Sequence, residues 1–303
     1  MVTDQLVIVR GGGDIATGTI RTLRRAGFPV LILESDHPSA IRRTVALSEA
    51  VYEGSATVED ITVSLAQNLD QAEYLLFQDG IAMMADPEGK AIRDILHNEE
   101  AYAEWDTGLT TLEGGGRHLF LTCVVDAILA KRNVNTTKDM APLVIALGPG
   151  FTAGVDCDVA IETMRGHNLG RAILDGSPLA NTGTPGLIAG HAADRVIHSP
   201  AAGIVKVHSQ IGDIVEEGQV IAEIVPNNDK PVPVRATFSG LLRGMIRDGF
   251  EVPGGFKIAD IDPRADQHDN CFRISDKARA IGGAVLTELI HFCAQKDIEA
   301  QGE

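Results

Sequence analysis

Gln5-Leu-Val-Ile-Val-Arg-Gly-Gly-Gly-Asp-Ile-Ala-Thr-Gly18 is the stretch of sequence on which our expectation of the fold depends. Its apolar run, Leu6–Val9, is too short for a helix and suits a buried strand. The turn that follows has the spacing G-x-G-x-x-A, and the residues after it, to Arg25, are compatible with a helix. A second apolar run, Val30–Leu33, ends at Glu34. The order strand, glycine turn, helix, strand and acidic residue is typical of a dinucleotide-binding βαβ unit.

The glycine turn and the start of the following helix form a predicted phosphate site. In a unit of this type the glycines turn the chain, let the backbone approach a phosphate and let the helix pack on the strand, while the first helical amides attract the anion. We therefore expect a nucleotide-type ligand here, with its ribose on Glu34. The residues expected on its phosphate are Gly11, Gly12, Gly13, Asp14 and Ile15. The alternative is a glycine-rich turn in an α/β sheet that binds nothing.

The composition is that of a globular, acidic chain. Its 303 residues are enough for two domains, and 44% of them are apolar, which is enough for a core. The 26 basic and 42 acidic side chains give a formal net charge of −16, which argues against nucleic acid or an anionic membrane as a partner. No apolar run is long enough to span a bilayer, and no signal-peptide pattern precedes the first strand. The four cysteines are scattered, so we expect reduced thiols and a cytoplasmic protein.

Several apolar runs end in an acidic residue or a glycine, as in an open parallel sheet with a ligand cleft at its carboxyl edge. The residues at these ends are Gly11, Glu34, Asp86, Asp126 and Gly148. We expect the acidic residues, together with Asp14 and the 148–154 loop that contains Gly148 and Gly150, to face one cleft. Each acid alone could instead cap a helix. A helix is expected to begin at Ala127 and to include Arg132.

Basic residues near these strand ends are candidates for balancing the charge of an anionic ligand, because Arg suits bidentate phosphate contacts and Lys point-charge contacts. They are Arg42, Lys131, Arg132 and Arg165. Arg42 fits a solvated basic turn equally well. His167 and Arg171 add positive charge after the strand expected at 159–163. His167 and Asp126 are the candidates for proton transfer, since histidine titrates near neutrality, although a lone histidine is often structural. No His or Cys pair has zinc-site spacing, and no metal is expected.

The second half of the chain contains an ungapped internal repeat, in which residues 197–224 match residues 234–261 at an offset of 37. Each copy has the pattern of short strands separated by glycine turns and is too small to bury a core alone. We therefore expect the copies to close on each other as a quasi-twofold β sandwich. The pattern resembles the barrel-sandwich hybrid of biotinyl and lipoyl carrier domains. Lys230 lies between the copies, but Pro231 follows it, so an ordinary solvated lysine is expected there.

Together these patterns predict an α/β fold class, with a Rossmann-like, mostly parallel sheet and a small all-β barrel-sandwich hybrid. The predicted domains are 1–194 for the Rossmann-like sheet and 195–263 for the barrel-sandwich hybrid. Residues 264–303 are expected to form a C-terminal segment and a helix that packs back on the α/β domain, because apolar residues recur at helical spacing after Asp276.

Seven motifs resemble one protein family over nearly the full length of the chain. They are Arg10-Gly-Gly-Gly-Asp-Ile-Ala-Thr-Gly18, Ala40-Ile-Arg-Arg43 with Ser48-Glu-Ala-Val-Tyr52, Val125-Asp-Ala-Ile-Leu-Ala-Lys-Arg-Asn133, Leu147-Gly-Pro-Gly-Phe-Thr-Ala-Gly154, Ile161-Glu-Thr-Met-Arg-Gly-His-Asn-Leu-Gly-Arg171, Asn181-Thr-Gly-Thr-Pro-Gly186 and Ser275-Asp-Lys-Ala-Arg-Ala-Ile-Gly-Gly283. The chain resembles the selenium-dependent molybdenum hydroxylase system (accessory) proteins, a family similar to the xanthine dehydrogenase accessory proteins. Asp156-Cys157-Asp158 departs from the Asp-x-His that the family tends to have.

The resemblance implies an accessory protein that matures the cofactor of a molybdenum hydroxylase and binds a molybdenum cofactor dinucleotide or NAD(P) at the Rossmann edge. The implied partners are a hydroxylase subunit or a cofactor biosynthesis protein, with a homo-oligomer as a further option. An NAD(P)-dependent oxidoreductase is one alternative, which substrate-dependent turnover of bound NAD(H) would favour. The other is a non-enzymatic scaffold or binding module that docks a hydroxylase subunit, which loss of hydroxylase activity without nucleotide binding would favour.

Overall fold

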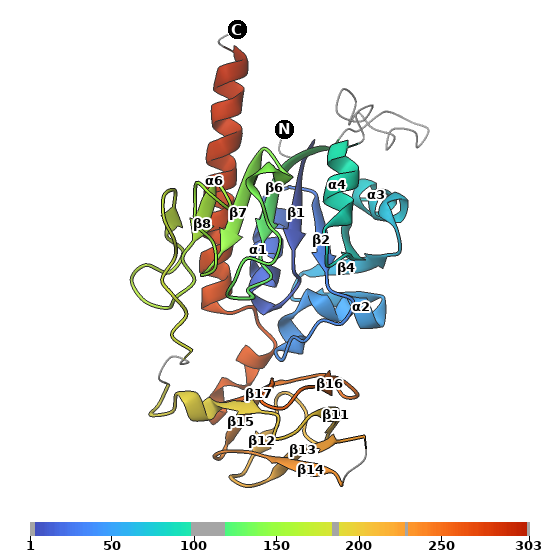
Figure 1. Ribbon diagram of the computed structural model, residues 1–303, viewed down its shortest axis with the longest axis vertical. Helices are drawn as coiled ribbons and strands as arrows, with labels where there is room; N and C mark the ends of the chain where they lie inside the picture. Colours follow the sequence, from blue (N-terminus) through green and yellow to red (C-terminus); the bar gives the residue numbers. More distant parts are fainter. Residues whose placement is uncertain (1–3, 98–118, 184–187, 228–229, 302–303) are drawn as a thin grey trace. The chain divides into compact units, whose positions relative to one another are not determined.

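The computed structural model describes residues 4–97, 119–183, 188–227 and 230–301, and the chain divides into two compact units (Figure 1). The large unit consists of Met1–Pro38, Leu47–Asn181 and Ile274–Glu303. The small unit consists of Ser39–Ala46 and Thr182–Arg273. Each unit is thus built from segments that are far apart in the sequence.

A nine-stranded sheet forms the centre of the large unit, with strand order β3-β4-β5-β2-β1-β6-β7-β8-β9. Its strands are β1 (Gln5–Arg10), β2 (Val30–Glu34), β3 (Ser55–Val58), β4 (Ile61–Ala66), β5 (Ile81–Ala85), β6 (Phe120–Asp126), β7 (Leu143–Leu147), β8 (Val159–Ile161) and β9 (Ala172–Ile173). The helices are α1 (Asp14–Arg25), α2 (Ala50–Glu53), α3 (Leu69–Phe77), α4 (Lys90–His97) and α6 (Asp276–Gln301), and the 3-10 turns are η3 (Leu47–Glu49) and η4 (Lys138–Met140).

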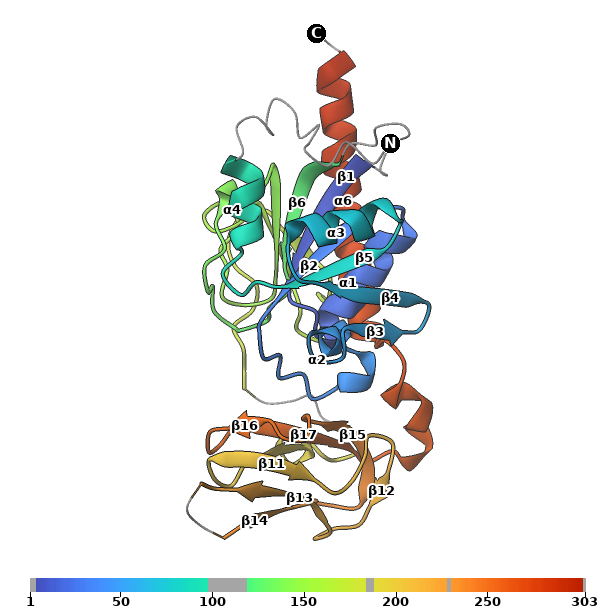
Figure 2. The same ribbon diagram turned by 90° about the vertical axis from the view of Figure 1, so that its right-hand side faces the viewer.

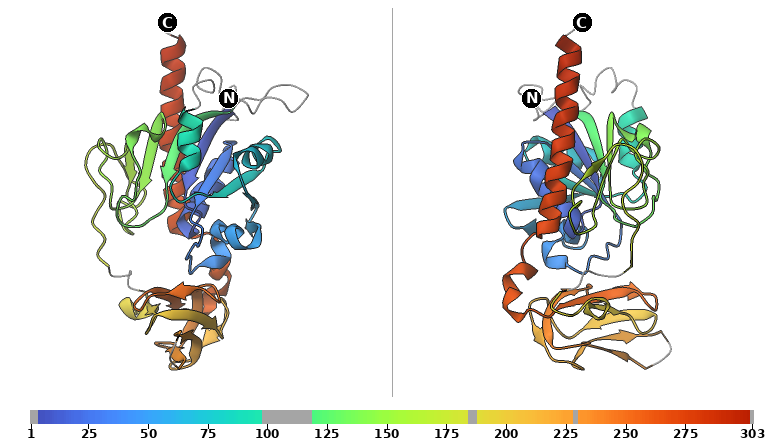
Figure 3. Two further views of the ribbon diagram at one scale, coloured as in Figure 1. Left: turned by 45° about the vertical axis from the view of Figure 1, so that its right-hand side comes forward. Right: turned by 90° about the vertical axis from the view of Figure 1, so that its left-hand side faces the viewer.

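Side chains alternate between the two faces of β1, and helices cover both faces of the sheet around this strand. The two predicted runs, Leu6–Val9 and Val30–Leu33, lie within β1 and β2. These strands are parallel neighbours in the sheet, and α1 connects them in the sequence. Because side chains alternate along a strand, Leu6 and Ile8 share one face and pack in a core with residues of α3 and α4. Helices α1 and α6 lie along the opposite face (Figure 2). Figure 3 shows the long α6 crossing that face.

The sheet corrects the predicted fold class. Pairs β3–β4 and β8–β9 at its two edges are antiparallel, and the six pairs between them are parallel, so the sheet is mixed and the predicted Rossmann-like sheet is corrected. The described segments that join β6 to β7 and β7 to β8 also contain no α-helix, whereas the crossovers of a Rossmann fold carry helices. Apolar runs locate strands but do not give their direction, so the sequence pattern could not reveal this.

Two four-stranded antiparallel sheets form the small unit, in the orders β10-β17-β15-β12 and β14-β13-β11-β16. Their strands are β10 (Val196–His198), β11 (Gly203–Val207), β12 (Ile214–Val215), β13 (Val220–Val225), β14 (Val232–Arg235), β15 (Gly240–Met245), β16 (Glu251–Val252) and β17 (Lys257–Asp262). The 3-10 turns are η2 (Arg43–Val45), η5 (Ala193–Arg195) and η6 (Ala265–Cys271).

The repeat corresponds to these strands one by one. The offset of 37 relates β10, β11, β12 and β13 to β14, β15, β16 and β17, and it converts the order of one sheet into that of the other. Each sheet therefore contains two strands from each copy, and their buried side chains, such as Val205 and Leu242, share one core. The biotinyl-like barrel-sandwich hybrid that we predicted is corrected to this pair of antiparallel sheets, because short strands between glycine turns do not distinguish one two-sheet architecture from another.

Residues 39–46 belong to the small unit because they bond to its backbone. The Arg43 guanidinium donates to the Met245 carbonyl (2.9 Å), and the Met245 amide donates to the Ile41 carbonyl (2.8 Å). The Thr44 hydroxyl donates to the Cys271 carbonyl (2.5 Å). Arg42 is buried and donates to the Asn270 carbonyl (2.9 Å). Arg42 is thus part of the small unit, whereas the glycine turn with which we grouped it lies in the large unit.

Candidate functional site

The first half of the glycine turn is packed against the rest of the large unit. Gly11 has a φ of 98°, and a side chain there would meet the Ala127 carbonyl oxygen at 2.9 Å. Gly12 is covered by Ser48, whose amide donates to the Gly12 carbonyl (2.9 Å). Both glycines are buried, whereas Gly13 is half-buried and has open space beside it. Of the backbone groups predicted to hold a phosphate, those from Gly13 onward are therefore the ones placed to reach a ligand.

The carboxylate of Glu34 is engaged with the backbone at this turn. It accepts hydrogen bonds from the amide of Gly12 (2.6 Å) and from that of Ser35 (2.7 Å). These contacts join the end of β2 to the turn after β1. The structure thus places Glu34 beside the glycine turn, where backbone amides of the protein use its carboxylate oxygens.

Helices α1 and α6 run parallel and in close contact. A side chain at Gly18 would lie 2.6 Å from the Ala278 side chain, and one at Gly282 would lie 2.7 Å from both the Gly18 carbonyl and the Thr22 hydroxyl. Because residue numbers rise together along the two helices, their amino ends point the same way. Each amino end carries partial positive charge. The two helices therefore present two such ends at the edge where β1 and β6 finish.

Three cationic side chains gather at these helix ends, and we call Lys131, Arg165 and Lys277 the cation cluster. Burial lowers the pKa of Lys277, and repulsion from Lys131 and Arg165 lowers it further, while Asp14 and Glu162 oppose this effect. Arg165 also forms a bidentate pair with Asp276 at the start of α6 (2.8 and 2.9 Å). The cation cluster thus lies beside the acidic residues Asp14, Glu162 and Asp276, and its positive charges could contact an anion at the helix ends.

The loop after β6 brings Lys131 to the cluster, and it is not the helix that we predicted over residues 127–132. Leu129 and Lys131 have φ values of 59° and 63°, in the left-handed region that non-glycine residues rarely adopt. The loop packs on Gly11 at one end and on Gly150 at the other, where a side chain would lie 2.5 Å from the Arg132 backbone. Local propensity favours a helix here, but these contacts determine the conformation, and strain of this kind is common at functional sites.

A buried ionic network holds the base of this loop. Arg10 and Asp126, each 1% exposed, pair at 3.7 Å, and the Thr136 hydroxyl donates to Asp126 (2.5 Å). Arg10 also donates to Thr136 and Asn135, and the Ile128 amide donates to Asp126 (3.1 Å). Burial raises the pKa of Asp126 and lowers that of Arg10. Asp126, which we predicted to transfer protons, is thus enclosed in a network that anchors the loop.

The remaining predicted residues lie at several positions around this edge. Asp86 caps α4 by accepting from the amides of Lys90 (2.9 Å) and Ala91 (2.8 Å), which is the capping alternative for that acid. His167 and Arg132 are exposed. Gly148 has a φ of 83° and lies against Thr163, and the Asn133 amide donates to the Gly150 carbonyl (3.1 Å). The structure thus brings Asp14, Lys131 and Arg165 to Lys277.

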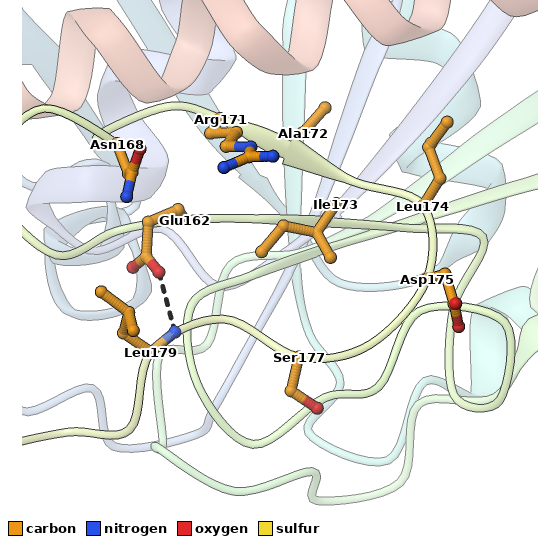
Figure 4. Close-up of a pocket in the computed structure, with 9 residues that line it drawn as sticks. All are labelled: Glu162, Asn168, Arg171, Ala172, Ile173, Leu174, Asp175, Ser177 and Leu179. Carbon is orange, nitrogen blue, oxygen red and sulfur yellow. Dashed lines mark hydrogen bonds between the residues drawn. The ribbon is translucent and has the colours of Figure 1, made fainter.

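A pocket of about 330 Å³ adjoins this cluster, between the β8–β9 hairpin and residues 174–179 (Figure 4). Glu162, which acts electrostatically on Lys277, also lines the pocket, and its carboxylate accepts from the amides of Met164 (2.7 Å) and Leu179 (2.8 Å). Figure 4 shows Asn168 and Arg171 near Glu162, with Asp175 at the other end. Within the described part of the chain, these three side chains form no hydrogen bond or ion pair.

Sequence reasoning missed Lys277. Its motif, Ser275-Asp-Lys, has the pattern of a helix start, and Lys277 lies more than a hundred residues from Lys131 and Arg165. The glycine pair Gly282–Gly283, which permits the close approach of α6, was the one signal that could have pointed to it. Among the described residues we find no group of three or more His, Cys, Asp or Glu side chains placed to hold a metal ion. No described helix is both long and apolar enough to cross a membrane.

Comparison with known proteins gives one clear relative. No protein-family model matches the chain. The sequence is 46% identical over 286 residues to "Uncharacterized protein YqeB" of Escherichia coli (strain K12). The match covers 94% of this chain but 47% of the relative, so the chain spans about half the length of the curated protein that it matches.

Similar solved structures are distant. The product-bound ectoine utilization protein EutE (DoeB) from Ruegeria pomeroyi matches with a TM-score of 0.22 and 11% identity, over 85% of this chain and 57% of that one. A succinylglutamate desuccinylase/aspartoacylase from Rhodobacter sphaeroides matches with a TM-score of 0.25 and 14% identity, over 85% of both chains. An aspartoacylase family protein from Mesorhizobium loti matches with a TM-score of 0.23 and 10% identity, over 85% of this chain and 56% of that one. These values are too low to transfer an activity to this chain.

The comparisons correct the predicted family. The curated relative is uncharacterized, the structures named above are an ectoine utilization protein, a desuccinylase/aspartoacylase and an aspartoacylase family protein, and none of these carries the name of a molybdenum hydroxylase accessory protein. The selenium-dependent accessory family predicted from the motifs is therefore wrong on these findings. The functions predicted together with this family are wrong on the same findings. They are cofactor maturation, the NAD(P)-dependent oxidoreductase and the hydroxylase scaffold.

Proposed function

We propose that the large unit binds a small phosphate-bearing ligand where α1 and α6 begin. The observation that carries this proposal is that two parallel helices place their amino ends beside the cation cluster. Helix amino ends attract anions through unpaired amides and the helix dipole, and Arg and Lys add full charges. A nucleotide-type ligand, predicted from the glycine spacing, belongs to this class and stays a prediction.

The overall charge of the chain supports a specific site. With a formal net charge of −16, the chain as a whole disfavours the approach of anions. A ligand that is retained must therefore meet local positive charge, which the cluster provides. The lowered pKa of Lys277 fits this interpretation, because a bound anion would offset the repulsion from Lys131 and Arg165.

Calorimetric titration with inorganic phosphate tests the proposal. We expect the full chain to bind phosphate with an affinity that falls as salt rises. A hydrogen bond to a charged group contributes about 1.5–3 kcal/mol, so Lys277→Met should weaken binding by roughly ten- to a hundredfold. Lys90→Met is the matched control, since Lys90 is an exposed lysine at the start of α4. Equal binding by the two variants, or no binding by the parent protein, would contradict the proposal.

The location and the partners stay predictions. A cytoplasmic location is supported by Cys123, Cys157 and Cys271, which are buried and form no disulfide with any described residue. For a binding partner, the sequence and the structure favour a small molecule at the cation cluster. A protein partner and a homo-oligomer are best tested by native mass spectrometry of the full chain, which reports subunit number and any co-purified ligand together.

A further inference from the structure

The pocket beside the cation cluster has polar groups that the protein itself does not use. The side chains of Asn168, Arg171 and Asp175 line it and form no hydrogen bond or ion pair with any described residue. These exposed polar side chains line the hollow from its two ends (Figure 4) and are available to a ligand. The volume of about 330 Å³ lies near the lower end of the range for small-molecule sites, about 300–1,000 Å³.

The position of Glu162 joins the pocket to the proposed anion site. Its buried carboxylate lines the pocket and also acts on Lys277. Arg165 of the cluster follows Glu162 by three residues, and Gly170 at the other end of the same loop lies against Ala280 of α6. The loop that connects β8 to β9 therefore forms one side of the pocket and contributes a member of the cluster.

We propose that this pocket holds the hydroxyl-bearing part of the ligand, so that the ligand class is a phosphorylated sugar. This proposal rests on the proposed anion site. The pocket offers donors from Arg171 and Asn168 and acceptors from Asp175 and Asn168, and hydroxyl groups can serve both. Arg171 gives the pocket one positive charge, and Asp175 and Glu162 give it two negative charges. This balance disfavours a second anionic group in the pocket. Ile173 and Leu179 supply apolar surface for the carbon face of a sugar ring.

Ribose 5-phosphate and inorganic phosphate are the two probes that test this proposal. We expect the full chain to bind ribose 5-phosphate about tenfold or more tightly than phosphate, since hydrogen bonds in the pocket add to those at the cluster. Asp175→Ala, at the end of the pocket remote from Glu162, should remove most of that advantage and leave the affinity for phosphate unchanged. Arg171→Met should reduce the same ratio, and Lys90→Met should leave it as in the parent protein.

The two proposals fail in different ways. If phosphate does not bind, the anion site is wrong. If phosphate binds but ribose 5-phosphate binds no tighter, or if Asp175→Ala weakens both probes equally, the anion site stands and the sugar pocket is overturned. If adenosine monophosphate gains a further tenfold over ribose 5-phosphate and this gain is lost in Asp175→Ala, the pocket recognises the base rather than the sugar, and the proposal is overturned in favour of a nucleotide.

Discussion

Single charged residues inside the large unit have roles that their sequence neighbourhoods do not show. Arg10 stands directly before the glycine turn, where a contact with a ligand would be the natural expectation, yet its guanidinium is buried and pairs with Asp126. Removing one member of a buried pair leaves an uncompensated charge, whereas replacing both by apolar groups is often tolerated. The pair therefore anchors the loop that carries Lys131.

Arg10→Met should be strongly destabilising, by about 3–5 kcal/mol, because the Asp126 carboxylate stays buried without its partner. The double variant Arg10→Met with Asp126→Leu should recover most of this loss. Urea unfolding, followed by circular dichroism, measures both free energies. A single variant as stable as the parent protein would show that the pair is not an anchor.

Glu73 on α3 should make stability depend on pH. Burial raises the pKa of Glu73 to about 7, with a further contribution from Asp70, against 4.5 as the ordinary value. The folded protein therefore retains a proton that the unfolded chain loses between these values. Stability from this group is fully present below 4.5 and declines as the pH rises towards 7. Glu73→Gln should remove this decline in a series of urea titrations, and an unchanged pH profile would contradict the assignment.

At the level of elements, the contact between α1 and α6 decides where the site forms. Two adjacent glycines in α6 offer a matched test. Gly282→Ala places a methyl group 2.7 Å from the Gly18 carbonyl, and overpacking of this kind costs about 1–3 kcal/mol. Gly283→Ala meets nothing within 4 Å and should stabilise the helix by up to about 1 kcal/mol. Gly282→Ala should also weaken phosphate binding, because it separates the two amino ends.

Thermal unfolding and calorimetry check this pair of variants. Opposite shifts of the melting temperature support the close crossing, and shifts in the same direction would refute it.

The elements also show how far the sequence could predict the structure. The apolar runs located β1 and β2 because buried strands have a local signature, and Lys131 and Arg165 were found near strand ends. The loop at 127–132 was predicted as a helix because its local propensity favours one. Its conformation is instead set by contacts with Gly11 and Gly150, which lie outside this segment of the sequence. Lys277 was missed for the same reason. Strand direction at the sheet edges and the family were beyond local patterns, and both predictions had to be corrected.

At the scale of the whole molecule, the two units allow ligand binding to be located. Hydrogen exchange should slow on addition of phosphate at the start of α1, in the 127–133 loop and at the start of α6, because a ligand bound to the folded form suppresses local opening. Exchange in strands β10–β17 should not change. Mass spectrometry of peptides from the full chain measures this, and protection confined to the small unit would place the site elsewhere.

The division of the chain between the units has a consequence for its synthesis. Residues 39–46 are made long before Met245 and Cys271, to which they bond, and α1 is made long before α6, its partner on the sheet. Neither unit can therefore finish folding until its last segment has been made. All segments of the small unit are present once Arg273 has been made, whereas the large unit also requires α6, which begins at Asp276.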